Sequence, residues 1–233
     1  MSARKRPSRK PAKRDTDATP FGAILHELVS RVPGAFGAAL VDSLGETVDY
    51  TGLVDPFEIR VAAAYLQIAL RQIDDFGAFG KTQWLIIRGA TKSVSAYQLP
   101  DGYVLAVLLR RRAGFTASRR AFASCERALA AEAGWALPAG RKWFAAEVEV
   151  DARGRPTRVR PASEASGRVA AGSAERSEEG NPYVDLVVLG AMMGLPARER
   201  GFRVRTTAGG AEITLVREAR RCWYADEDPS GLR

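Results

Sequence analysis

The chain has 233 residues, of which 46% are hydrophobic and 27% charged, a balance typical of a soluble globular protein with one large or two small domains. No run approaches the roughly 18 apolar residues of a membrane-spanning helix, and the basic start lacks the apolar core of a secretory signal, so we expect a cytoplasmic protein. Cys125 and Cys222 are far apart with only His26 to assist them, which argues against a disulfide framework or a zinc site.

The net charge of +8 is concentrated at the amino end, since residues 1–14 contain seven basic side chains and no acidic one. Residues 1–19 offer almost nothing apolar to bury, so we predict a disordered basic tail. Such a tail can attract nucleic acid, an anionic surface or an acidic protein weakly, and salt weakens that attraction.

Apolar residues at helical spacing predict three helices in the next part of the chain. Each follows a residue that can cap its first turn and ends at glycine or Pro-Gly. The expected helices cover residues 20–32, 55–76 and 116–134, and their capping residues are Thr19, Asp55 and Thr116.

Five strands are predicted between these helices from short runs of apolar and β-branched residues separated by turn residues. Their ranges are 35–41, 46–50, 82–88, 93–99 and 103–109. The order α-β-β-α-β-β-β-α specifies one mainly antiparallel five-stranded sheet flanked by helices, an α/β fold of the α+β type.

The middle helix is apolar around more of its circumference than the usual stripe of about 100°. One row holds Phe57, Val61, Tyr65 and Ile68, and a second row holds Ala62, Leu66, Ala69 and Ile73. A helix of this kind needs two surfaces to cover it.

Three stretches follow one another in the order of these elements: "VPGAFGAALVDSLGETVDYTG" after the first helix, "WLIIRG" after the long helix, and "YQLPDGYVLAVLL" around a tight Asp-Gly turn. Through these stretches and the element order, residues 20–134 resemble the Roadblock/LC7 family. None of the stretches is specific alone, and together they cover about half the chain.

The resemblance implies a homodimer in which the middle helices pack together and the third strands pair edge to edge. Phe57, Val61, Tyr65 and Ile68 would then form the dimer or partner interface. It also implies a non-catalytic regulator or scaffold, often of a small Ras-like GTPase. The alternative is that the whole helix packs on its own sheet or under the C-terminal segment.

The C-terminal half resembles no family that we recognise. A β-hairpin is predicted within residues 135–160, from strands at 144–150 and 157–160, followed by a flexible linker over residues 161–181. Residues 182–233 are predicted to form a small, β-rich α+β unit with a helix at 183–193 and strands at 202–206, 211–217 and 221–225.

Five arginines at the junction of the last strand and the last helix form the most clustered positive charge of the folded region. They are either a solvated edge or a binding site for an acidic partner or a phosphate. They are Arg110, Arg111, Arg112, Arg119 and Arg120. With the basic tail they support an alternative hypothesis, a nucleic-acid-associated protein. A third hypothesis, an enzyme with its site in the C-terminal segment, lacks a motif, and we predict no catalytic, cofactor-binding or metal-binding residues.

Overall fold

The computed structural model describes residues 19–78, 80–113, 118–137, 143–162, 182–218 and 221–232. The predicted tail, except Thr19, and most of the predicted linker lie outside these residues. The described residues form two compact units, one of residues 19–22 and 35–113, the other of residues 23–34 and those from 118 onward. This division differs from the boundary at residue 134 expected from the sequence.

The three predicted helices are confirmed as α1 (Pro20–Arg31), α2 (Pro56–Phe76) and α3 (Arg119–Ala133). Thr19 Oγ1 accepts a hydrogen bond from the Gly22 N–H at 3.2 Å, and Asp55 Oδ1 accepts from Phe57 N–H at 3.0 Å. At α3 the prediction of Thr116 as the cap is wrong. The helix begins after Ser118, whose Oγ accepts from Ala121 N–H at 3.0 Å, while Thr116 lies outside the described residues.

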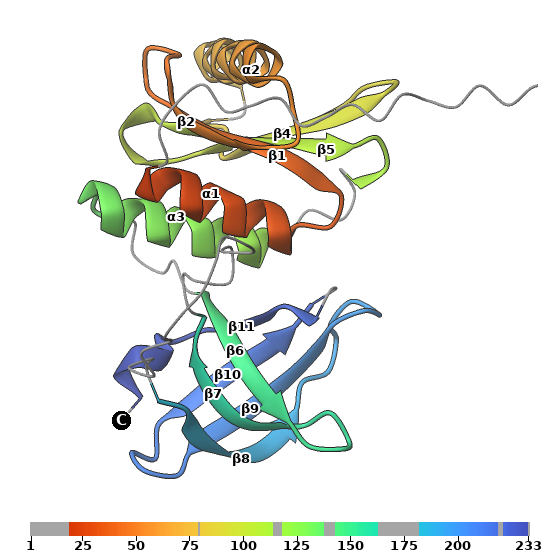
Figure 1. Ribbon diagram of the computed structural model, residues 1–233, viewed down its shortest axis with the longest axis vertical. Coiled ribbons are helices and arrows are strands. Elements are labelled where there is room, and N and C mark those ends of the chain that lie inside the picture. The colour runs from red at the N-terminus through yellow and green to blue at the C-terminus, as the bar shows by residue number, and fades with distance from the viewer. Residues whose placement is uncertain are drawn as a thin grey trace, which may run out of the picture. The chain divides into compact units, whose positions relative to one another are not determined.

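The predicted five-stranded antiparallel sheet is also confirmed, with strand order β2-β1-β5-β4-β3 (Figure 1). Its strands are β1 (Ala35–Val41), β2 (Thr47–Gly52), β3 (Trp84–Arg88), β4 (Lys92–Gln98) and β5 (Val104–Arg110). β5 is buried along all but its last residue, because it lies at the centre of the sheet.

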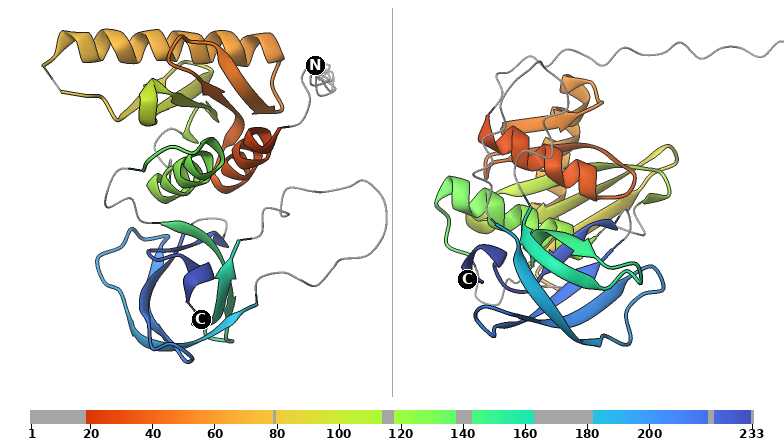
Figure 2. Two further views of the ribbon diagram at one scale, coloured as in Figure 1. Left: turned by 90° about the vertical axis from the view of Figure 1, so that its left-hand side faces the viewer. Right: turned by 60° about the horizontal axis from the view of Figure 1, so that its bottom comes forward.

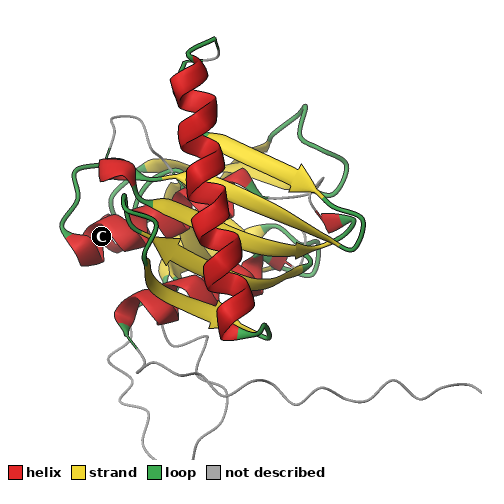
Figure 3. Ribbon diagram, turned by 90° about the horizontal axis from the view of Figure 1, so that it is seen from above, coloured by secondary structure: helices red, strands yellow, loops and turns green. Residues whose placement is uncertain are grey.

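Helix α2 runs across one face of this sheet (Figure 3). Its buried side chains, including Ile59, Leu66 and Leu70, join one apolar cluster with Tyr50 and Leu108 of the sheet. Burial of each such large side chain contributes about 1.5–3 kcal/mol to folding. This cluster fixes which side of α2 faces inward.

The C-terminal strands close into a six-stranded antiparallel barrel of order β10-β11-β6-β7-β8-β9 (Figure 2). The strands are β6 (Phe144–Val150), β7 (Pro156–Pro161), β8 (Val184–Ala191), β9 (Arg200–Thr206), β10 (Glu212–Arg217) and β11 (Trp223–Ala225). A short 3-10 turn, η5 (Pro229–Gly231), follows them. The predicted hairpin and the strands predicted after residue 182 therefore belong to one barrel, and the chain has a β-rich C-terminal part as expected.

The predicted helix at residues 183–193 is wrong, because this segment is strand β8. Val184, Leu186 and Val188 pack against the barrel core, whereas Val187 and Leu189 on the alternate positions are 52% and 43% exposed. This alternation has the period of two expected of a strand. A short, valine-rich apolar run is compatible with either a helix or a strand in sequence, and pairing within the barrel favours the strand.

Candidate functional site

The outward side of α2 carries a row of exposed apolar side chains. Phe57 is 74% exposed, Tyr65 69% and Ile68 50%, while Val61 is partly buried. At about 100° per residue, this row is centred opposite the buried residues Ile59 and Leu66. The predicted two-sided helix is therefore present, with its second side uncovered by the described part of the chain.

Strand β3 forms an open edge of the sheet in the same unit, since β4 is its one ladder partner among the described strands. Gln98 N–H donates to Gln83 O at 3.0 Å, and Gly89 N–H donates to Lys92 O at 2.9 Å. The alternation of an antiparallel ladder then directs the backbone polar groups of Ile87 toward β4 and those of Ile86 away from it. Ile86 is 39% exposed and Ile87 44%. This edge can accept a further strand.

The five predicted arginines are divided between the two units. Arg110, Arg111 and Arg112 are exposed at the end of β5 in the first unit. Arg119 and Arg120 belong to α3 in the second unit, where Arg119 is exposed and Arg120 is partly buried.

Arg120 is held by two carboxylates of its own unit. Its Nη1 lies 2.8 Å from Glu199 Oε2 and 2.6 Å from Glu218 Oε1, with the three side chains 10% to 19% exposed. The guanidinium also lies over the ring of Trp143, 4.7 Å from its centroid. Arg120 therefore links α3 to the residues that flank strands β9 and β10, and its contact with a partner stays a prediction.

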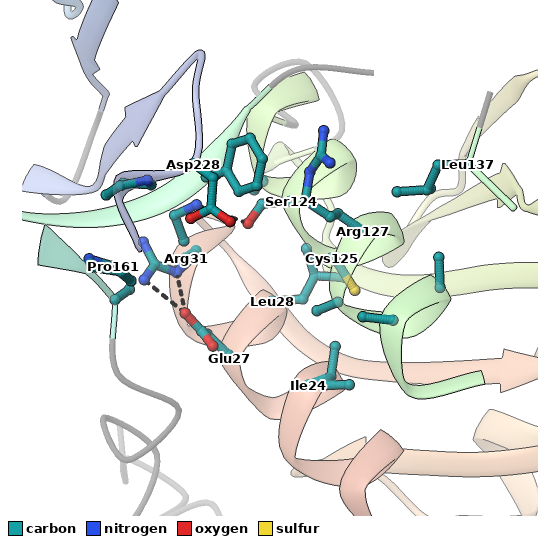
Figure 4. A pocket seen from close by; sticks show the side chains of 18 of the residues that line it. Ile24, Glu27, Leu28, Arg31, Ser124, Cys125, Arg127, Leu137, Pro161 and Asp228 are labelled. Atoms are coloured by element: carbon teal, nitrogen blue, oxygen red, sulfur yellow. Dashed lines mark hydrogen bonds and ion pairs between the residues drawn. The ribbon is translucent and has the colours of Figure 1, made fainter. Parts of the chain in front are cut away.

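A pocket of about 540 Å³ lies in the second unit between α1, α3 and the start of β6 (Figure 4). Its walls are mainly apolar, with Ile24 and Leu28 from α1, Cys125 from α3, and Leu137 and Phe144. Sequence analysis missed this pocket, because its lining residues come from segments more than a hundred residues apart.

Several polar groups of this pocket contact their neighbours. Glu27 and Arg31 form an ion pair with an O–N distance of 2.7 Å, and Ser124 Oγ accepts from Ala145 N–H at 3.1 Å. The Arg127 guanidinium lies 3.9 Å from the centroid of the Phe144 ring. These contacts support packing of α1 and α3 on the barrel and leave a largely apolar space.

Burial raises the pKa of the Cys125 thiol far above its ordinary value, and Glu27 and Glu126 add to this effect. A thiol with a raised pKa is neutral at pH 7 and a poor nucleophile. Among the described residues, no three His, Cys, Asp or Glu side chains are grouped closely enough to hold a metal ion. No helix in the described ranges is long and apolar enough to span a membrane.

The first unit thus defines an α+β domain with an open sheet edge and a helix that is apolar on two sides. Over about half its length, the chain is similar in fold to solved Roadblock/LC7 domains and MglB proteins, while the rest is unassigned. It is similar to the Roadblock/LC7 domain from Streptomyces avermitilis, with 21% identity and a TM-score of 0.40 over 48% of this chain and 95% of that one.

The chain is also similar to MglB from Myxococcus xanthus, with 17% identity and a TM-score of 0.44 over 51% of this chain and 98% of that one. It is similar as well to the gliding protein MglB from Thermus thermophilus, with 17% identity and a TM-score of 0.42 over 51% of this chain and 94% of that one. No protein-family model matches the sequence, and no curated protein does.

Proposed function

We propose that this protein is a non-catalytic regulator or scaffold that works as a homodimer joined through the outward side of α2. The observation that carries the proposal is the exposure of Phe57, Tyr65 and Ile68 along one row of a helix whose opposite side is already packed. A contiguous exposed apolar patch is typical of a protein–protein interface.

The expected energetics favour association. Each large side chain removed from water contributes about 1.5–3 kcal/mol when fully buried, and a two-fold symmetric interface uses the same row from both protomers. The β3 edge, which lies in the same unit, adds backbone hydrogen bonds if the two copies of Ile86 meet there.

A dimer that is coupled to folding can be tested without any variant. The urea midpoint of unfolding should rise with protein concentration, since association stabilises the folded state by mass action. A midpoint that stays the same over a hundred-fold range of concentration would contradict the dimer.

The partner that we propose is a small Ras-like GTPase, in keeping with the family resemblance in the sequence. A purified GTPase of this class from the same organism, loaded with GDP or with a non-hydrolysable GTP analogue, should bind the full chain with an affinity that depends on the nucleotide. Equal affinity for the two forms, or no binding to either, would exclude that GTPase as a regulated partner.

A further inference from the structure

A second hollow in the second unit, of about 830 Å³, lies beside α1 and strands β6, β10 and β11. We refer to it as the arginine groove, because Arg31, Arg217 and Arg221 line it. Its volume falls in the range of about 300–1,000 Å³ that is common for small-molecule sites. All of its lining residues belong to the one compact unit.

The acidic side chains of the groove already have basic partners. Glu27 pairs with Arg31 at 2.7 Å, Glu147 with Arg160 at 2.6 Å, and Asp151 with Arg155 at 2.9 Å. These pairs neutralise every carboxylate in the lining.

Arg217 and Arg221 are in a different situation, since neither forms an ion pair with any residue in the described part of the chain. Arg217 is the last residue of β10 and is partly buried, while Arg221 is exposed beside Cys222 in the following turn. The groove therefore has two guanidiniums whose charge is not balanced within it.

The backbone conformation of Arg221 is a second, independent indication that the groove is a ligand site. Its φ is 60°, in the left-handed region, and it lies in the turn closed by the hydrogen bond from Glu218 N–H to Cys222 O at 2.8 Å. Glycine adopts this conformation freely, whereas another residue costs on the order of 1–2 kcal/mol. Such residues often occur at ligand sites, and here the strained residue is one of the two unpaired arginines.

We propose that the arginine groove binds a small molecule with a phosphate group, held by Arg217 and Arg221. A guanidinium matches phosphate oxygens with two parallel N–H donors. Two such groups suit a phosphate monoester, with a charge of about −1.5 to −2 at pH 7, better than a single carboxylate. Tyr183 also lines the groove, but its ring is already packed against Arg158 and Arg160. Arg217 and Arg221 therefore carry the recognition. This activity is independent of the proposed dimer.

Isothermal titration of the full chain with pyrophosphate, at fixed ionic strength, tests the proposal. Arg217→Gln and Arg221→Gln should each weaken binding by about ten-fold or more, the loss expected for a charged hydrogen bond. The matched control is Arg203→Gln on β9, a 68% exposed arginine paired with Glu212 outside the groove, and it should bind as the wild type does. Wild-type affinity in both groove variants would overturn the proposal, as would a wild-type protein that does not bind pyrophosphate.

Arg221→Gly separates binding from folding. It relieves the left-handed strain, so its thermal midpoint should be higher than that of the wild type while its pyrophosphate affinity falls as in Arg221→Gln. A glycine variant that keeps wild-type affinity would contradict the role of the side chain, and one with a lower midpoint would contradict the strain.

Discussion

Phe57 and Ile59 lie two residues apart on α2, yet Phe57 is 74% exposed and Ile59 is 1% exposed. Ile59 packs in the apolar cluster between the helix and the sheet, whereas Phe57 points to the opposite side. Two nearby apolar positions therefore have separable roles, one in folding and the other in association.

Ile59→Ala should lower the free energy of unfolding by about 2–4 kcal/mol, because it removes buried methyl groups and leaves a cavity. Phe57→Ala should weaken dimerisation and leave the folding of the single chain almost unchanged. Urea unfolding at low and high protein concentration distinguishes the two effects. The assignment fails if Phe57→Ala at low concentration is as destabilising as Ile59→Ala.

Proline substitutions at two neighbouring residues test the β3 edge. Ile86→Pro removes an N–H that points away from β4, so the sheet should tolerate it while edge pairing between protomers is lost. Ile87→Pro removes an N–H directed at β4 and should destabilise the fold. Circular dichroism melting and sedimentation measure the two outcomes, and an Ile86→Pro variant that still dimerises like the wild type would rule out edge pairing.

Arg120→Met should destabilise the second unit by about 3 kcal/mol, because Glu199 and Glu218 would remain close together and partly buried without their cation. Arg203→Met is the control, since its ion pair with Glu212 is exposed and solvent-screened. Chemical denaturation followed by tryptophan fluorescence compares them. Equal stability of the two variants would show that Arg120 is not a structural tie.

The two thiols should differ in reactivity. Cys125 is 5% exposed and burial raises its pKa, while Cys222 is partly exposed. Brief iodoacetamide treatment at pH 8 should therefore label Cys222 in the native protein and both cysteines in urea, as read by mass spectrometry. Native labelling of Cys125 at a comparable rate would mean that the pocket opens readily.

Local patterns predicted the helices and much of the five-stranded sheet. The spacing of Ile24 to Val32 and of Phe57 to Ile73, with Asp55-Pro56 at a helix start, indicated the helices before any contact was known. The Pro100-Asp101-Gly102 turn separated β4 from β5 because Asp101 and Gly102 adopt positive φ there. These features are local, so sequence reasoning reaches them.

Long-range contacts were beyond this reasoning. Arg120 pairs with Glu199 and Glu218, which lie 79 and 98 residues further along the chain. No local pattern around Arg120 indicates these partners. Closure of the barrel depends on β6 pairing with β11, which no local pattern indicates. Arg217 and Arg221 were not singled out, because their lack of partners is evident only from the fold.

Light scattering of the wild type and of Tyr65→Arg at matched concentrations tests the dimer most directly. Tyr65 is 69% exposed at the middle of the α2 row, and Leu44→Arg, at an 80% exposed leucine outside that row, is the control. We predict twice the chain mass of 25.2 kDa for the wild type and for Leu44→Arg, and the single-chain mass for Tyr65→Arg. A wild type that remains at the single-chain mass, or a Tyr65→Arg variant that remains a dimer, would contradict the proposed interface.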